Sequence, residues 1–367
     1  DKPVVFAQEP SERAGTEAVG RILAAAEELF ARQGFDAVSM NTIAEAASVS
    51  KANPLRSPRR AADGGRSMPG TVIEEDLVAK RKIVTNEALD AYLTPQRDGE
   101  SEIYSAIRHT LLAGGFRWRP VMVLTVADMF GADERKFLPF ACGVELIHAA
   151  AMILDDLPCM DNAERRHGKA ACHRVFGEAV TILASHQLLV LSLKLFHETL
   201  NLVDPDAVRF PRNRFNSEYE HLMSNMIVGQ TKDVLATGKD LTEQEVLFTY
   251  VRKSGALYEF STRLSALLAG ATPDEIESVS MFGRFLGIAY QILDDIYDIE
   301  GGPEEVGKDI GKDVGKPTFP SLFGCIGAKV RMHHFKNQAL EQLLTMGEGA
   351  ASLRRLAERI VPSKALL

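Results

Sequence analysis

The stretch YQILDDIYD, Tyr290–Asp298, places three aspartates at the end of an apolar segment. Asp294 and Asp298 are four residues apart, so on a helix their side chains lie on one face, with Asp295 beside them. Like charges at this spacing repel each other and destabilise the helix. A cation should therefore compensate them, and hard divalent ions such as Mg²⁺ prefer carboxylate oxygens.

A second stretch of the same kind, ILDDLPCMD, lies upstream at Ile153–Asp161. Asp155 and Asp161 are six residues apart, which would place them on different faces of a straight helix. Pro158 lies between them and breaks a helix, so a bend can bring both carboxylates to one site. One Asp–Asp pair alone is most simply a solvated helix end. Two such clusters, each after an apolar helix, indicate a metal site at the mouth of an apolar cavity.

The rest of the chain predicts helices almost everywhere. Apolar residues recur at helical spacing, as in VGRILAAAEELFARQG, YSAIRHTLLAG and TILASHQLLVLSLKLF, whereas strand patterns are weak. The fold class is therefore all-α. A break rich in Pro, Gly, Ser and Arg predicts a linker over 51–70, between a short helical extension, 1–50, and a long body, 71–367. Further loops are expected at 202–216 and 300–318.

Composition narrows the class of protein. Hydrophobic residues make up 46% of the chain and charged residues 25%, which is typical of a soluble globular protein. The net charge of −8 argues against bulk binding of nucleic acid. The four cysteines form no CxxC pair and predict free thiols in a reducing compartment. The apolar runs look too short for a membrane span, and the N-terminus lacks the order of a signal peptide. We therefore expect a cytoplasmic protein.

The two clusters resemble the aspartate-rich motifs of the trans-isoprenyl diphosphate synthases, the polyprenyl synthetase family. The closest text is that of bacterial carotenoid-type geranylgeranyl diphosphate synthases, and the similarity runs from about Glu75 to Val361. Its markers occur in the order GGFRWRP, ELIHAAAMILDDLPCMDN, RRHGK, HRVFGEA, VGQTKD, RKSGALYEF, YQILDDIYD, GKDIGKDVGKPT and LRRLAERIV. The resemblance implies an isoprenoid-synthase helical bundle around a central cavity, and a homodimer.

The resemblance also implies a reaction. A Mg²⁺-dependent prenyltransferase of this kind, with two or three ions per site, condenses an allylic diphosphate such as farnesyl diphosphate with isopentenyl diphosphate (IPP). Ionisation, condensation and elimination would then give geranylgeranyl diphosphate. Cations placed where the leaving group gains charge lower the barrier, and an apolar cavity keeps water from the carbocation.

Site residues carry over from the matching motifs. The expected Mg²⁺ ligands are Asp155, Asp156, Asp161, Asp294, Asp295 and Asp298. Arg166, Lys253, Ser254, Gln291 and Lys308 are expected on the allylic diphosphate, with Lys316 near it and Gln230 and Asp233 facing the site. Arg119 and His148 match positions that hold the diphosphate of IPP, with Arg117 and His167 beside them. Without the resemblance, Lys253 would be interpreted as a surface lysine and His148 as a core histidine.

Departures from the family pattern fall on the IPP side. The family usually has a lysine where this chain has Phe116, and an arginine where it has His167, with Arg165 one residue early. Each lost charge-assisted contact weakens binding by about 1.5–3 kcal/mol, so two losses would weaken IPP binding about 10²- to 10⁴-fold. An alternative function is therefore an IPP-independent class I terpene synthase. Leu154, where many relatives have histidine, is tolerated in the carotenoid-type branch.

The side chains at two positions of the sequence bear on the length of the product. By the resemblance, the product tail grows past the helix turn before the first aspartates, where Ala150 and Ala151 stand. Both side chains are small, which leaves room for a C20 chain. An aromatic residue at either position would close the cavity earlier.

The N-terminal segment, about 15–51, resembles the start of a TetR-type helix-turn-helix. The resemblance ends at ANPLRSPRR, where Pro54 and Pro58 oppose a continuous recognition helix. Without that helix, little can enter a major groove. We expect a structural appendage; a DNA-binding regulator and a non-catalytic partner subunit are the less favoured alternatives.

Overall fold

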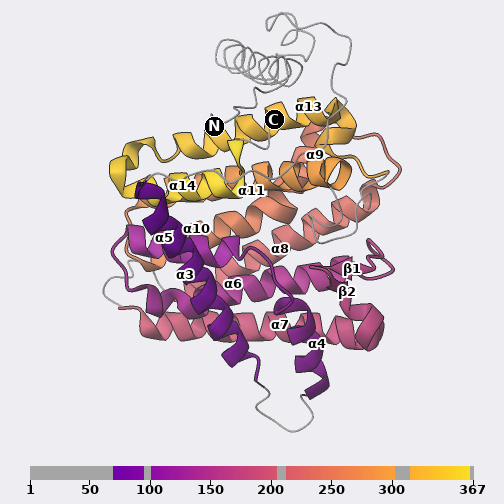
Figure 1. Ribbon diagram of the computed structural model, residues 1–367, viewed down its shortest axis with the longest axis horizontal. Coiled ribbons are helices and arrows are strands. Elements are labelled where there is room, and N and C mark those ends of the chain that lie inside the picture. Colours follow the sequence, from indigo (N-terminus) through magenta and orange to yellow (C-terminus); the bar gives the residue numbers. More distant parts are fainter. Residues whose placement is uncertain (1–68, 95–100, 205–211, 302–314, 364–367) are drawn as a thin grey trace, which may run out of the picture.

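The computed structural model describes residues 69–94, 101–204, 212–301 and 315–363. These residues form a bundle of helices with one short hairpin, so the all-α prediction is confirmed (Figure 1). The N-terminal extension, nearly all of the linker, and Lys308 lie outside the described residues.

The described elements follow one another along the chain in this order. The first half contains α3 (Pro69–Tyr92), α4 (Ser101–Leu111), α5 (Trp118–Met129), α6 (Glu134–Asp155), β1 (Arg165–Arg166), β2 (Lys169–Ala170) and α7 (Cys172–Leu202). The second half contains α8 (Arg212–Ala236), α9 (Glu243–Tyr250), the π-helical turn η2 (Val251–Gly255), α10 (Ala256–Leu268), α11 (Pro273–Glu300), α13 (Phe319–Glu341), the 3₁₀ turn η3 (Leu344–Ala350) and α14 (Ala351–Ile360).

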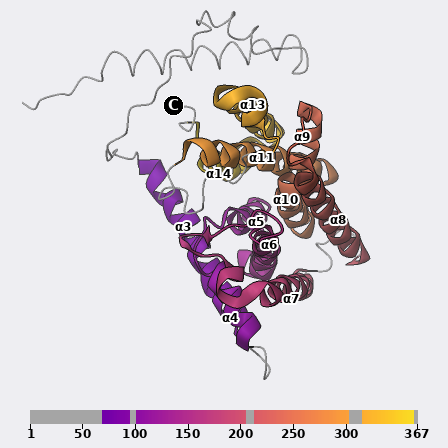
Figure 2. The ribbon, with the colours of Figure 1, turned by 90° about the vertical axis from the view of Figure 1, so that its right-hand side faces the viewer.

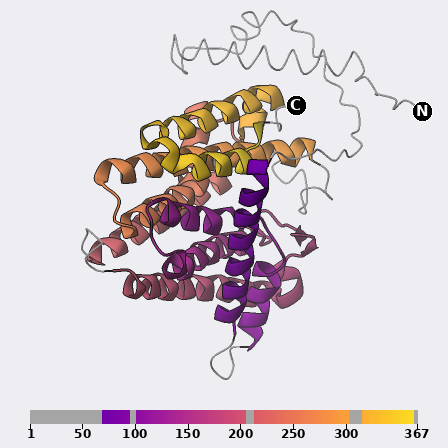
Figure 3. The same ribbon diagram turned by 60° about the vertical axis from the view of Figure 1, so that its left-hand side comes forward.

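Neighbouring helices stack as layers across the bundle. Figure 1 shows α13 and α14 at one edge and α7 at the opposite edge. Between them, α11 packs on α13 and α10, while α6 packs on α5 and α7. The turned view separates the α8–α11 side from the α4–α7 side (Figure 2), and α3 runs across α5 and α6 (Figure 3). The two helices that carry the aspartate motifs near their C-terminal ends, α6 and α11, therefore lie inside the bundle.

Local sequence explains where the helix of the second motif begins. Thr272 caps the N-terminus of α11: its hydroxyl accepts from the backbone N–H of Glu275, and the Glu275 side chain accepts from the backbone N–H of Thr272. Pro273 occupies the first helical position, where its missing N–H leaves no intrahelical bond unmade. The helix then continues without a break to Glu300, through all three aspartates of the motif.

Among the helices that the structure describes, α6 and α7 are long and apolar enough to span a membrane by length and composition. The expectation that the apolar runs are too short is therefore wrong for these helices. In α6, 72% of the most apolar window is buried in the bundle, and in α7 the share is 39%. Core helices of soluble proteins pass the same test, because protein and lipid interiors both favour apolar side chains. The apolar surface that α7 leaves exposed still requires an explanation.

Candidate active site

The first aspartate motif lies in a tight turn at the end of α6. The helix ends at Asp155, and the backbone N–H of Asp161 donates to the Asp155 carbonyl at 2.9 Å. The chain thus turns back on itself around Pro158, as the sequence analysis expects. Asp155 and Asp161 consequently lie next to each other despite a spacing that does not suit a straight helix.

The second residue of this motif, Asp156, is paired with an arginine. Its carboxylate is 1% exposed and accepts from Arg166, with Arg166 Nε 3.1 Å from Oδ1 and 3.3 Å from Oδ2, and Nη2 also on Oδ1. Both carboxylate oxygens are therefore used to hold the guanidinium. This contact favours Asp156 as a positioning residue for Arg166, and its role as a metal ligand stays a prediction.

A two-residue hairpin presents Arg166 to Asp156. Strand β1 pairs antiparallel with β2, with Arg166 opposite Lys169. The turn residues His167 and Gly168 both have positive φ, 51° and 76°. Such turns match the twist of a hairpin, and Gly168 adopts this conformation without strain. His167 therefore lies at the hairpin tip, beside Arg166.

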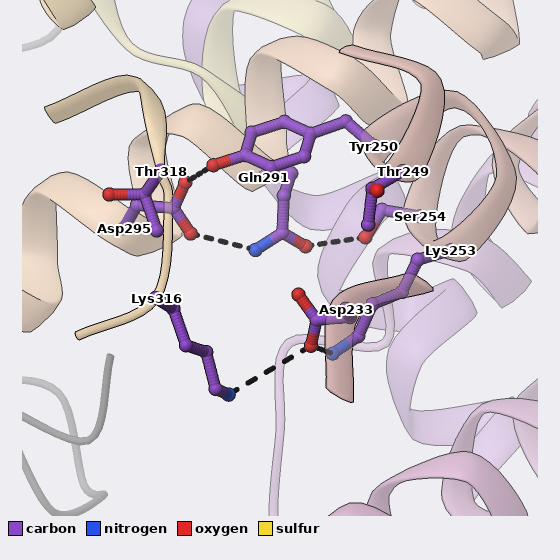
Figure 4. Close-up of a pocket in the computed structure, with 9 residues that line it drawn as sticks. All are labelled: Asp233, Thr249, Tyr250, Lys253, Ser254, Gln291, Asp295, Lys316 and Thr318. Atoms are coloured by element: carbon purple, nitrogen blue, oxygen red, sulfur yellow. Dashed lines mark hydrogen bonds and ion pairs between the residues drawn. The ribbon is translucent and has the colours of Figure 1, made fainter. Parts of the chain in front are cut away.

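The second motif contains a similar division of roles. Asp295 is 3% exposed, and its Oδ1 accepts from Gln291 Nε2 at 2.9 Å while its Oδ2 accepts from the Tyr250 hydroxyl. The Ser254 hydroxyl in turn donates to Gln291 Oε1 (Figure 4). Both oxygens of Asp295 thus contact protein donors. Asp295 therefore supports this network, and its role as a metal ligand stays a prediction.

Tyr250 was missed by the sequence analysis. Its hydroxyl donates to Asp295 and accepts from the backbone N–H of Phe319 at 3.3 Å, so it ties the start of α13 to α11. The only sequence signal for this role is its place three residues before Lys253 in the RKSGALYEF region. That signal is too weak to identify a partner 45 residues away.

Carboxylates and ammonium groups alternate across the site. Lys253 Nζ lies 2.7 Å from Asp233 Oδ2 and 3.8 Å from Asp155 Oδ2. Lys316 Nζ lies 2.6 Å from Asp161 Oδ1 and 3.8 Å from Asp233 Oδ2. Figure 4 shows Lys253 and Lys316 directed toward Asp233 in the same pocket. The interpretation of Lys253 as a surface lysine is therefore excluded.

Close packing of α8 on η2 brings Lys253 to Asp233. A Cβ atom at Gly229 would lie 2.5 Å from Lys253 N, so only glycine permits this approach. The η2 segment, Val251–Gly255, is a π-helical turn. Such turns are rare and frequently occur at functional sites.

Burial makes the Asp155 carboxyl hard to ionise. It raises the pKa of Asp155 to about 6, and the charges of Asp161 and Asp233 add to this effect while Lys253 opposes it. The pKa of Lys253 is raised, because the nearby carboxylates outweigh its own burial. The site therefore gathers negative charge that favours bound cations.

Within the described residues, no three His, Cys, Asp or Glu side chains converge on one point in the way of a closed metal site. Mg²⁺ commonly takes only one or two carboxylates, with water and substrate phosphates as its other ligands. Asp155 and Asp161 on one side, and Asp294 and Asp298 on α11, fit ions that are shared with a diphosphate. The donor set is thus compatible with Mg²⁺.

Arg119 and His148 lie on the other side of the site. The Arg119 guanidinium lies over the Tyr258 ring, 4.5 Å from its centroid, and its buried Nε has no hydrogen-bond partner among the described residues. Burial and the positive charge of Arg119 lower the pKa of His148 well below its ordinary value. Burial and neighbouring arginines lower the pKa of His167 to about 4. Both imidazoles are therefore neutral near pH 7.

Arg117 is a structural residue, in contrast to its predicted role in substrate binding. It is 4% exposed, and its donors all contact protein: Nε lies 2.9 Å from Asn86 Oδ1, Nη1 lies 2.8 Å from Glu145 Oε1, and Nη2 donates to the Leu111 carbonyl. Its backbone is left-handed, with φ 60°, at the entry to α5. The buried pair with Glu145 fixes that entry and leaves Arg119 as the available cation of GGFRWRP.

Phe116 makes no contact that replaces an ammonium group. Its ring stacks on Trp118, with centroids 5.3 Å apart and planes 7° apart, and 63% of the residue is exposed. Position 116 therefore offers no cation to a substrate, as the sequence predicts.

The remaining predicted residues are on α8 and α6 or lie outside the described residues. Gln230, on α8, has a buried Nε2 without a hydrogen-bond partner among the described residues. Ala150 is buried and Ala151 half-buried in the last turns of α6, before Asp155. Lys308 lies outside the described residues.

Fold and site together define an all-α protein in which aspartates of α6 and of the turn after it lie among lysine and arginine side chains. The family model named polyprenyl synthetase matches residues 100–350. The chain belongs to the polyprenyl synthetase family, and it is a prenyl diphosphate synthase of the trans-prenyltransferase class. The resemblance found from the motifs is confirmed.

Individual relatives are similar over most of their length. Farnesyl diphosphate synthase of Geobacillus stearothermophilus is 34% identical over 78% of this chain and 96% of its own. Geranylgeranyl pyrophosphate synthase 10 of Arabidopsis thaliana is 35% identical over 78% of this chain and 83% of its own. The structure of geranylgeranyl pyrophosphate synthetase from Geoglobus acetivorans matches with a TM-score of 0.68 at 25% identity, covering 79% of this chain and 99% of that one.

The N-terminal segment has a separate match. A family model for bacterial regulatory proteins of the tetR family matches residues 22–53. This agrees with the resemblance noted in the sequence, over a segment outside the described residues.

Proposed function

We propose that this chain condenses farnesyl diphosphate with IPP to give geranylgeranyl diphosphate, in a Mg²⁺-dependent reaction. The observation that carries the proposal is the alternation of acidic and basic side chains across the site, in the order Asp155, Lys253, Asp233, Lys316 and Asp161. Carboxylates that bind metal and ammonium groups that bind phosphate are here interleaved at contact distance. That arrangement suits a diphosphate that leaves as an anion.

The metal-binding role falls to a subset of the aspartates. Asp155 and Asp161 of the first motif, with Asp294 and Asp298 of the second, would hold Mg²⁺. Bound Mg²⁺ supplies neutralisation of the diphosphate charge, which lowers the barrier to breaking the C–O bond. Asp156 acts through Arg166, whose guanidinium it orients toward the site.

The protein's own cations complete the allylic diphosphate site. Lys253, Lys316 and Arg166 are placed to contact phosphate oxygens, and their charges are fixed before substrate arrives. Preorganised charges of this kind stabilise a leaving anion without reorganisation during the reaction. Water must be kept from the allylic cation, and a bound substrate tail among apolar side chains of the bundle would do so.

Two small residues support a C20 product. Ala150 and Ala151 precede Asp155 on α6 and leave space for a growing tail. The relatives do not decide the length, because a farnesyl and a geranylgeranyl diphosphate synthase are 34% and 35% identical to this chain. The proposal of geranylgeranyl diphosphate therefore rests on these two alanines.

A terpene synthase that ionises the allylic substrate without IPP is the second candidate. Two observations favour it: Phe116 offers no charge, and the pKa of His167 is lowered to about 4. Membership of a family of chain-elongating enzymes argues against it. Incubation with Mg²⁺ and farnesyl diphosphate, with and without IPP, separates the two. We expect geranylgeranyl diphosphate only when IPP is present; a hydrocarbon or alcohol formed without IPP contradicts the proposal.

We propose that the chain forms a homodimer through α7 and α8. Exposed apolar side chains follow these helices at helical spacing, and they are Val175, Ile182, Leu183, Val190, Ile227, Val228, Val234 and Leu235. Val190 is 63% exposed, which is costly for valine in water. Light scattering should give a dimer for the wild type and a monomer for Val190→Lys, with Leu344→Lys, at an exposed residue of η3, as the control. A wild-type monomer contradicts this proposal.

The domain organisation is likewise a proposal. Residues 1–50 would be an appendage, 51–70 a linker and 71–367 the catalytic domain. The protein would be located in a reducing compartment such as the cytoplasm, where its four free cysteines stay reduced. A variant that lacks residues 1–68 should keep its prenyltransferase activity and its dimer. Loss of activity in a folded truncated protein would contradict the division.

A further inference from the structure

Tyr258, on α10, carries a buried hydroxyl that the fold does not satisfy. The residue is 0% exposed, and its Oη has no hydrogen-bond partner within the described part of the chain. Leaving a buried hydroxyl unpaired destabilises a protein, and such exceptions in native structures need an explanation. A polar ligand that arrives during function is one such explanation.

Arg119 provides the second observation. Its guanidinium lies over the Tyr258 ring at 4.5 Å, and its own buried Nε also lacks a partner within the described residues. The Tyr258 hydroxyl and Arg119 Nε are thus two neighbouring donors without acceptors. One ligand that carries several acceptor atoms could pair with both. A diphosphate, which offers only acceptor oxygens and negative charge, meets this requirement.

We propose that the Tyr258 hydroxyl donates a hydrogen bond to the diphosphate of IPP, beside Arg119, and so helps to determine the affinity for this substrate. This inference rests on the proposed condensation with IPP. It adds a substrate-binding residue from α10 to a site that the motifs assign to Arg119 and His148.

Packing fixes the direction of the hydroxyl. A Cβ atom at Gly287 would lie 3.0 Å from Tyr258 Cβ and 3.1 Å from its Cγ, so α11 presses on the base of the ring. The Tyr290 ring lies on another side, with centroids 5.7 Å apart. The ring therefore cannot swing away, and the hydroxyl is held in place for a ligand.

The charges around Tyr258 keep it a donor. Burial raises its pKa to about 12, Arg119 opposes this shift, and the carboxylates of Glu145 and Asp294 add to it. A phenol with such a pKa stays protonated through the physiological range. It offers an O–H to an anion, and it does not compete with the anion as a negative charge.

The need for another donor follows from the departures of this sequence. Phe116 stacks on Trp118 in place of the lysine that the family has, and His167 is neutral. The IPP side therefore lacks two of its expected cations. A hydrogen bond from Tyr258 to a charged phosphate oxygen compensates in part for that loss.

Steady-state kinetics and calorimetry of Tyr258→Phe test the proposal. Removing one hydrogen bond to a charged group weakens binding by about 10- to 100-fold. We expect the KM for IPP, and its Kd measured by calorimetry with Mg²⁺, to rise by at least about tenfold, with an unchanged KM for farnesyl diphosphate. Thr199→Val is the matched control, because Thr199 Oγ1 is another buried, unpartnered hydroxyl, on α7. It should leave both KM values unchanged.

Two further readouts separate a substrate contact from a structural role. Tyr258→Phe should not lower the melting temperature of the ligand-free protein, because it removes an unpaired hydroxyl. Phe116→Lys should restore IPP affinity in the Tyr258→Phe background by returning a cation to the same substrate. A folded Tyr258→Phe protein whose IPP affinity stays within twofold of wild type overturns the proposal.

Failure of the proposed function gives a different result. Calorimetry needs no turnover, so wild-type protein that binds IPP more tightly than Tyr258→Phe supports the inference even if no condensation occurs. Wild-type protein that elongates an allylic diphosphate while Tyr258→Phe binds IPP equally well overturns this inference alone. Wild-type protein that shows no IPP binding overturns both.

Discussion

The ammonium group of Lys316 lies 2.6 Å from Asp161 Oδ1, although 155 residues separate the two positions. Both side chains are mostly buried, with 13% and 20% of their surfaces exposed. The contact joins the segment that leads into α13 to the turn after α6, and it places a lysine at the carboxylates of the first motif. This mostly buried ion pair holds the two distant segments together at the proposed diphosphate site.

Lys316→Ala should lower kcat/KM for the allylic substrate by about 10- to 100-fold, since one charge-assisted contact to phosphate is lost. Lys316→Arg should restore part of this loss. Initial rates at varied farnesyl diphosphate measure the effect. Lys136→Ala, which removes an exposed lysine of α6, is the control. Equal kcat/KM for Lys316→Ala and wild type would remove Lys316 from the site.

Asp155→Asn and Asp156→Asn should have different effects on stability. Asp156 holds the mostly buried Arg166, and removal of one partner of a buried ion pair costs about 3–5 kcal/mol. Asp156→Asn should therefore lower the free energy of unfolding as well as activity. Asp155→Asn should abolish activity while the stability changes much less.

Denaturant unfolding and product assays on the same preparations check this division. A stable Asp156→Asn protein with only its Mg²⁺ dependence altered would return Asp156 to the metal ligands. Full turnover by Asp155→Asn would refute the metal assignment itself.

Ala151→Phe should shorten the product from C20 to C15. A phenyl ring on this turn of α6 would fill the space into which the tail grows. Chromatography of products formed from dimethylallyl diphosphate and excess IPP measures the length. Met152→Leu conserves volume on the next residue and should leave the product unchanged. A C20 product from Ala151→Phe would place the floor of the cavity elsewhere.

Acid should destabilise the protein partly through His334, on α13. Burial, followed by the positive charges of Arg331 and His333, lowers the pKa of His334 from 6.5 to about 4. The folded state thus prefers the neutral ring, whereas the unfolded chain takes up a proton below pH 6.5. This contribution to stability is present above pH 6.5 and is lost as pH falls toward 4.

Melting temperatures of wild type and His334→Gln between pH 7.5 and 4 test the histidine prediction. The variant should lose less stability than wild type over this range. A steeper loss in the variant would show that His334 is not held neutral in the fold.

Local pattern was sufficient to predict much of the fold. Helical periodicity gave the all-α class, and Pro158 gave the bend that brings Asp161 back to the Asp155 carbonyl. These features depend on neighbours within one or two turns of helix. The start of α11 at Pro273 is encoded in the same way, through a threonine cap and a glutamate three residues later.

Roles within each Asp–Asp pair were not predictable from the sequence. Adjacent residues of a helix point in different directions, and only the tertiary fold shows that Asp156 contacts Arg166 and Asp295 contacts Tyr250. Arg117 and Arg119 are a similar case. Arg117 has a left-handed backbone at the entry to α5, and its guanidinium lies in the core. The guanidinium of Arg119 remains available to the site.

The proposed reaction joins an allylic diphosphate to IPP at the site between the two aspartate motifs. Mass spectrometry of products from unlabelled farnesyl diphosphate and fully ¹³C-labelled IPP, with Mg²⁺, tests it most directly. We expect geranylgeranyl diphosphate heavier by the carbon label of one IPP unit, and no such product from Asp155→Asn. An unlabelled C15 hydrocarbon or alcohol as the main product would contradict the account.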